Sequence, residues 1–186
     1  VIGRLGDLTF PKMEISGIGG TSVSASGRII GFPDALNAWY NLDIKNLQAN
    51  GTDFEQFVEN GILPTSIKFA DKMIIKGTFK GKPNNFYTNL AINSNLGKAH
   101  VKTSFDNRIE NREKYNGTVL LDNFDLGKVI KNSSVGKITL KANVKGTGLN
   151  IKTATANVDG FMRKGVFNKY DYQNLTIKGT IINGRY

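Results

Sequence analysis

A strict alternation of apolar and polar residues constrains this chain more than any other feature. It is clearest over residues 137–145, where every second residue is apolar and the intervening residues are lysine, threonine or asparagine. Successive side chains of a strand point to opposite faces, so this pattern predicts a strand with one apolar and one water-facing side. The same period of two recurs over residues 71–81, 86–93, 99–105 and 175–182. We therefore expect an all-β protein.

Two short helical signals interrupt the strands. Residues 52–55, Thr-Asp-Phe-Glu, match a capping box and predict a helix over 53–60. Asp125 precedes apolar residues spaced as one side of a helix, which predicts a helix over 125–132 with Asp125 as its cap.

The helical signals also mark a repeat. Each lies between two strands, so residues 40–105 and 115–182 are interpreted as degenerate copies of one β-rich unit. The 186 residues fit one domain, and because the chain begins at Val1 we expect a segment of a longer repeat protein. About a dozen strands with one apolar face predict a curled sheet, or half-pipe. The alternative is a closed β-sandwich.

Three local features give narrower expectations. Pro11 cannot donate to a sheet ladder, so it predicts an edge or a bend. Leu149 and Ile151 predict a strand whose phase changes at Ala154, which indicates a bulge. His100, the only histidine, occupies a polar position of its strand and is interpreted as a surface residue.

Composition and motifs argue against several classes of function. Cysteine is absent, so disulfides and thiolate metal sites are excluded. No apolar run is long enough for a membrane-spanning helix. The acidic residues fall mostly at turns and helix starts, and no catalytic or phosphate-binding motif is present. We expect a protein that is not an enzyme and that has neither a cofactor nor a metal site.

The net charge of +10 comes mainly from lysine. A basic protein of this kind binds nucleic acid or anionic lipid headgroups in some cases. Here the lysines are spread along the chain at alternating positions, which is typical of the solvent face of strands. Arginines are few and most aromatic residues share the apolar phase, so we expect no nucleic-acid partner.

Several segments together resemble one known family. They are NLDIKNLQANGTDFEQFV, KGTFKGKPNNF, YNGTVLLDNFDLGKVI, GKITLKANVKGTGLN and YDYQNLTIKGTIINGRY. The DLGK helix, the VKGTGL strand end and the closing YxYxNLxIxG strand are the most informative parts. From about Gly6 to the C-terminus, the chain resembles the TamB branch of the AsmA-like proteins.

The resemblance implies a large cell-envelope protein of Gram-negative bacteria, anchored in the inner membrane and crossing the periplasm. Its family fold is a β-taco with a hydrophobic groove. The family is associated with bridge-like phospholipid transport between the two membranes and with outer-membrane biogenesis and protein secretion. This chain would be an internal or C-terminal-side segment, with the membrane anchor and the region that meets an outer-membrane assembly protein outside it.

The expected ligand is the acyl chain of a phospholipid, held in a groove lined by residues of one alternation phase. The candidate groove residues are Ile75, Phe79, Phe86, Leu90, Ile92, Val101, Phe105, Ile138, Leu140, Val144, Ile151, Leu175 and Ile177. If a second sheet covers these residues, they are an ordinary core.

Two alternative functions remain open. One is a chaperone-like β-scaffold that pairs its edge with nascent outer-membrane strands. The other is a surface adhesin or glycan-binding domain, for which Tyr87, Tyr170 and Tyr172 are the plausible aromatic residues. We also expect edge-to-edge self-association of the isolated segment, through residues 1–10 and 175–186.

Overall fold

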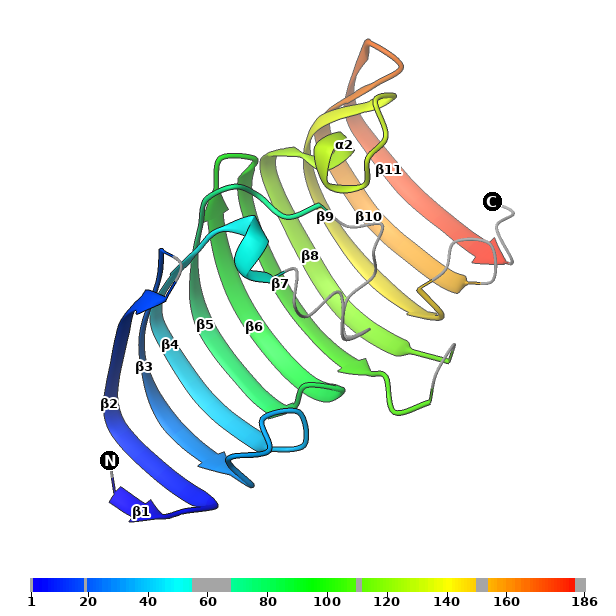
Figure 1. The fold of residues 1–186 in the computed structure, drawn as a ribbon. Helices are drawn as coiled ribbons and strands as arrows, with labels where there is room; N and C mark the ends of the chain where they lie inside the picture. The colour runs from blue at the N-terminus through cyan, green and yellow to red at the C-terminus, as the bar shows by residue number, and fades with distance from the viewer. Residues whose placement is uncertain (1, 19, 55–67, 110–111, 150–153, 183–186) are drawn as a thin grey trace.

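A computed structural model describes residues 2–18, 20–54, 68–109, 112–149 and 154–182. Its eleven strands form one antiparallel sheet in which the order of the strands follows the sequence (Figure 1). The strands are β1 (Ile2–Arg4), β2 (Asp7–Ile18), β3 (Thr21–Ile30), β4 (Trp39–Ala49), β5 (Met73–Lys82), β6 (Asn85–Ser94), β7 (Gly97–Asp106), β8 (Lys114–Asp125), β9 (Val135–Thr147), β10 (Thr155–Phe167) and β11 (Tyr170–Ile182). The helical segments are the 3₁₀ turn η1 (Gly51–Phe54) and α2 (Leu126–Val129).

Tight hairpins join several of the neighbouring strands. Two residues connect β5 to β6 and β6 to β7, because Lys82 pairs with Asn85 and Ser94 pairs with Gly97. The hairpin between β10 and β11 turns through Asn168 and Lys169, with φ angles of 49° and 68°. Positive φ at both positions matches the right-handed twist of the flanking strands.

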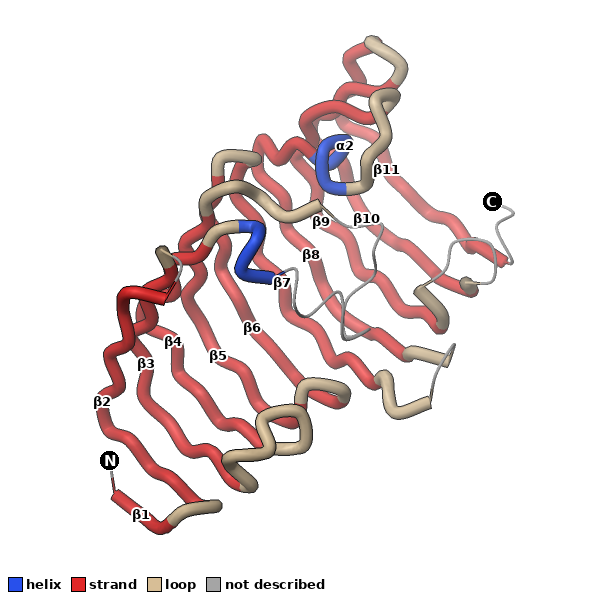
Figure 2. The backbone as a smooth tube through the Cα atoms, viewed as in Figure 1, coloured by secondary structure: helices blue, strands red, loops and turns tan. Residues whose placement is uncertain are grey.

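The sheet is strongly curved along its strands and forms an open trough (Figures 1 and 2). Register shifts lie between Phe10 and Met13 in β2, Ile44 and Leu47 in β4, Leu121 and Phe124 in β8, and Met162 and Lys164 in β10. Bulges bend a strand and increase its twist, so these irregularities favour curling. Pro11 falls within the first of them, as its missing donor predicts.

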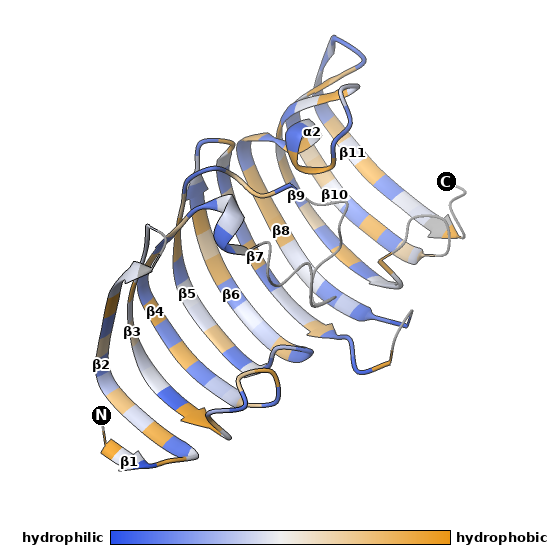
Figure 3. Cartoon of the chain, viewed as in Figure 1, coloured by the Kyte–Doolittle hydropathy of each residue, from blue (hydrophilic) through white to orange (hydrophobic). Residues whose placement is uncertain are grey.

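The expectation of an all-β curled sheet is confirmed. The closed β-sandwich is wrong for the described part of the chain, because all eleven strands belong to one unclosed sheet. Apolar and polar residues alternate along these strands in Figure 3.

The best-buried cluster lies beneath the segment at 68–70 and α2. It consists of Ala70, Met73, Ile75 and Leu96, with Phe69 and Val129 packed against it. The amide of Lys68 donates to the Val129 carbonyl at 2.8 Å, which joins the segment to α2. These two elements therefore cover only a local part of one face of the sheet.

The helical predictions are partly correct. Asp125 caps α2 as expected, since its carboxylate accepts a hydrogen bond from the Lys128 amide at 3.2 Å. The helix ends at Val129 rather than near 132, because Ile130 is already its C-cap and Lys131 has a φ of 54°. The predicted helix over 53–60 lies mostly outside the described residues, and its described start belongs to the 3₁₀ turn η1.

The strand predicted to begin at Leu149 is wrong. The preceding strand β9 ends at Thr147, Gly148 follows with a φ of 79°, and β10 begins at Thr155. The residues before and after the apparent phase change at Ala154 therefore do not belong to one strand that begins at Leu149. Ile151 lies outside the described residues.

Candidate functional site: the apolar face

The paired strands bring their apolar residues together on one side of the sheet, which we call the apolar face. Its first row of register partners crosses ten strands without a polar residue. The row is Ile15, Val23, Leu47, Ile75, Ile92, Ala99, Leu121, Leu140, Met162 and Leu175. Nine strand spacings of about 4.8 Å make this row roughly 43 Å long.

The second row is also entirely apolar or glycine. It contains Met13, Ala25, Ile44, Gly77, Leu90, Val101, Val119, Ala142, Gly160 and Ile177. Gly77 has a φ of 135°, and an added Cβ would overlap the Asn89 carbonyl oxygen. Only glycine fits there without moving the neighbouring strand.

Aromatic rings line the apolar face near the hairpin between β5 and β6. Phe79 and Phe86 have ring centroids 4.9 Å apart, and Phe86 and Phe105 are separated by 5.3 Å. Tyr40 meets the edge of Phe79 at 6.3 Å. These separations are typical of favourable ring packing, so the cluster stiffens this end of the face.

The hydroxyl groups on the apolar face are paired by the sheet itself. Thr88 is buried and its Oγ1 donates to the Thr78 carbonyl at 2.9 Å. Ser94 Oγ donates to the Gly97 carbonyl at 2.9 Å, and Thr103 Oγ1 donates to the Asn116 carbonyl at 3.2 Å. These hydroxyl groups donate to main-chain carbonyls, which reduces their availability to an outside ligand.

Two phenols among the described residues of this face have shifted pKa values. Burial raises the pKa of Tyr40, with a further contribution from Asp34. Burial also raises the pKa of Tyr115, with Glu113 acting in the same direction. Neither phenol ionises near neutral pH, and neither of the two all-apolar rows contains a charged residue. The face thus offers apolar contact in a fixed shape.

Much of the apolar face is only half-buried. Apart from Ile75, which is buried, and Leu175, which is exposed, the described candidate groove residues are of intermediate exposure. Within the described part of the chain, no large side chain is fully buried. A second sheet packed on this face would have buried many of them, so the described strands leave the face without a covering sheet.

All the described candidate groove residues share the apolar face. Ile75, Ile92, Leu140 and Leu175 lie in the first row, and Leu90, Val101 and Ile177 lie in the second. Phe79, Phe86, Phe105 and Val144 belong to neighbouring rows of that face, while Ile138 lies beyond the β8 bulge opposite Phe124. Ile151 is outside the described residues.

Sequence reasoning missed the contribution of β2–β4 and β8 to the candidate site. Val23, Leu47 and Leu121 lie in the first row, and Val119 lies in the second. Alternation gives Val23 and Leu47 the same signal as the chosen residues. It cannot choose between Leu120 and Leu121, because both are apolar and they point to opposite faces.

The described residues also narrow the possible chemistry. They contain no group of histidine and acidic residues arranged to hold a metal ion. In the same part of the chain, neither helical segment has the length and apolar character needed to cross a membrane. Comparison with family models, curated proteins and solved structures gives no match for this chain.

Proposed function

We propose that this chain is a non-enzymatic segment that holds phospholipid acyl chains on its apolar face and lets them move along the sheet. The proposal includes transport between the inner and outer membranes, and a place in the periplasm within an inner-membrane-anchored protein. The observation that carries the acyl-chain part is the first row, which is apolar across ten strands and has six members that are half-buried or exposed. The resemblance to the TamB branch supports the cellular part, including a role in outer-membrane protein assembly.

The dimensions suit an acyl chain. The row of roughly 43 Å exceeds the ~30 Å hydrocarbon core of a bilayer, so chains from a single leaflet fit along it. Each methylene group transferred from water to an apolar surface contributes about 0.8 kcal/mol. Because six of the ten side chains of the row are half-buried or exposed, part of this free energy is available to a ligand.

The distribution of charge suits a lipid whose headgroup remains in water. The two all-apolar rows carry no cation that could pair with a phosphate. Lysines such as Lys76, Lys102 and Lys141 lie on the opposite face, which we call the polar face. A phospholipid would therefore contact the protein through its acyl chains and leave its phosphate at the open side.

Site-specific photocrosslinking tests the proposal in the full-length parent protein, in cells. A photoreactive residue at Val101 lies on the apolar face, and one at the adjacent Lys102 lies on the polar face. We expect phospholipid adducts at Val101 and background levels at Lys102. Equal adducts at both positions, or none at Val101, would contradict acyl-chain binding.

A second candidate, the strand-pairing scaffold, is favoured by the edge strand β11. Its thirteen residues pair with β10 alone among the described strands. Such an edge templates pairing with another strand, in nascent outer-membrane proteins or in a second copy. Successive N–H groups of a strand point to its two opposite edges. Of two adjacent positions in β11, one N–H therefore points to β10 and the other to the free edge. Separate Ile177→Pro and Lys178→Pro variants remove one donor of each kind. If both leave the sedimentation of the isolated segment unchanged, edge pairing is wrong.

The arrangement of tyrosines gives no support to glycan binding. Tyr87 lies on the polar face of β6, where it pairs with Lys80 and Ser104. Tyr170 and Tyr172 lie in β11, five strands away in the sheet. A shallow aromatic platform needs rings close together, so these three residues do not form one.

A further inference from the structure

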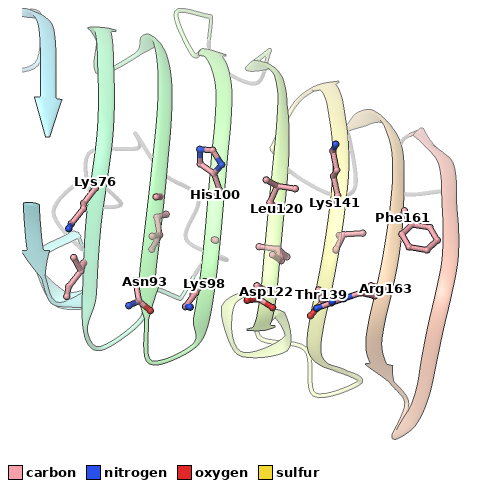
Figure 4. A pocket seen from close by; sticks show the side chains of 16 residues that line it. Lys76, Asn93, Lys98, His100, Leu120, Asp122, Thr139, Lys141, Phe161 and Arg163 are labelled. Atoms are coloured by element: carbon pink, nitrogen blue, oxygen red, sulfur yellow. The ribbon is translucent and has the colours of Figure 1, made fainter. Parts of the chain in front are cut away.

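The polar face contains an open depression of about 770 Å³ that crosses strands β5–β10 (Figure 4). Its lining combines apolar and basic side chains. The apolar members that belong to the polar face are Ile74, Ala91, Leu120 and Phe161, and the basic members are Lys76, Lys98, Lys141 and Arg163. Ile92, Ala99, Leu121 and Leu140 of the first row also border the depression, although their side chains belong to the apolar face. This depression lies on the opposite side of the sheet from the proposed acyl-chain surface.

One row of register partners forms the floor of the depression. It runs Lys76, Ala91, His100, Leu120, Lys141 and Phe161 from β5 to β10. Apolar side chains thus occur at every second strand, in β6, β8 and β10. Ala91, Leu120 and Phe161 are all exposed, although lysine and asparagine predominate around them. Single exposed apolar residues are ordinary, whereas an aligned set rimmed by charges marks an interaction surface.

The basic side chains around this row are not neutralised by the fold. Among the described residues, Lys76, Lys98, Lys141 and Arg163 form no ion pair, and Asp122 is the one carboxylate in the lining. His100 is held by Asn89, with Nε2 lying 2.6 Å from Oδ1. The depression therefore presents a row in which Ala91, Leu120 and Phe161 alternate with Lys76, His100 and Lys141, with Lys98 and Arg163 beside that row.

We propose that this depression docks an acidic amphipathic helix of a partner protein. Apolar contacts two strands apart are separated by about 9.6 Å, which is close to the ~10.5 Å between helix residues i and i+7. Five strand spacings of about 4.8 Å match a helix of about 16 residues. Leucine-like residues at heptad spacing would meet Ala91, Leu120 and Phe161, while flanking carboxylates would meet the four cations.

The shape of the depression favours a rod over a flat membrane surface. Lysine and arginine side chains extend further from a sheet than leucine or alanine, so a bilayer would meet the charged groups first. Leu120 and Ala91 would then remain in water. A helix lying along this mixed row contacts both kinds of side chain and leaves the apolar face free for its own ligand.

The test uses a fluorescent, helix-stabilised peptide of about 18 residues, with leucine at every seventh position and glutamate beside it. Binding to the whole 186-residue chain is followed by fluorescence anisotropy at low salt. Each of Leu120→Gln, Phe161→Gln and Lys141→Glu should weaken binding about tenfold. Ile30→Gln and Lys80→Glu replace an exposed apolar residue and a lysine on the polar face outside the depression, and should leave affinity within about twofold.

A peptide of identical composition with scattered leucines separates the helix from simple charge attraction. Equal binding of this peptide overturns the proposal, as does failure of the striped peptide to bind. Binding to phosphatidylglycerol vesicles that is lost in Leu120→Gln, without peptide binding, would assign the depression to a membrane surface instead. Circular dichroism of every variant confirms folding, and these results are independent of the lipid adducts at Val101.

Discussion

The two faces of this sheet use neighbouring residues of the same kind for different purposes. Ile75 on the apolar face is 6% exposed, whereas Ile74 on the polar face is 40% exposed. Leu121 and Leu120 show the same contrast, with 9% and 38% exposure. Hydrophobicity therefore does not specify the role of a residue in this chain. The role follows from the phase of the strand, which decides what the side chain meets.

The two faces also differ in how their apolar residues are arranged. The apolar face is continuous across ten strands, which suits a ligand that slides and needs no fixed register. The apolar residues of the polar face are confined to one depression and alternate with cations, which suits a partner of defined pattern. The same strands could thus serve a mobile ligand on one side and a specific partner on the other.

Truncation of the adjacent residues Ile74 and Ile75 should give the largest difference in stability between a change on the polar face and a change on the apolar face. Ile75→Ala removes a side chain from the buried cluster with Met73 and Leu96, and should lower the free energy of unfolding by about 2–5 kcal/mol. Ile74→Ala should cost no more than about 1 kcal/mol. Urea denaturation of both variants checks this, and equal losses would show that the faces are buried alike.

Changes at the aromatic cluster should have a smaller effect. Phe86→Leu removes the ring contacts with Phe79 and Phe105, worth about 0.5–1.5 kcal/mol beyond area burial. Tyr87→Leu, at the next position on the polar face, should change stability by about 0.5 kcal/mol or less. A double-mutant cycle between Phe86 and Phe105 isolates the ring contact, and a coupling energy of zero would contradict it.

Alternation was sufficient to predict the central strands and the shared face of their residues. In β5, β6 and β7 no bulge interrupts the pairing, so the period of two keeps every side chain in phase from one strand to the next. The capping carboxylate of Asp125 was predictable for a similar reason, since both the cap and the apolar residues are local.

The remaining features depend on pairing between distant segments. The bulges at Ile44/Leu47 and Met162/Lys164 change the phase within a strand, and runs such as Phe161-Met162 give no local signal of direction. Whether the sheet closes depends on its accumulated twist and curvature. The depression on the polar face requires the register of six strands, so single-strand patterns could not reveal it.

The smallest effect is expected at an exposed ion pair near the end of β7. Arg108 donates to the Asp106 carboxylate through Nε at 2.8 Å and Nη2 at 2.6 Å, and its amide donates at 3.1 Å. These hydrogen bonds lower the pKa of Asp106 from 3.8 to about 2, with a minor contribution from the charge of Lys114. Because the folded-state pKa is lowered, the associated stabilisation is present above pH 3.8 and is lost as the pH falls toward 2.

Removal of Arg108 should therefore change a titration curve more than it changes stability. Arg108→Ala should return the pKa of Asp106 toward 3.8, measured by NMR titration of its side-chain carboxyl carbon, whereas Lys114→Ala should move it much less. The pair is solvent-exposed and screened, so thermal unfolding at neutral pH should be almost unchanged in both variants. A large loss of stability in Arg108→Ala would mean that this turn supports the adjoining apolar face. It would weaken the contrast between the buried positions of that face, where substitutions are costly, and the exposed positions around it, where they are not.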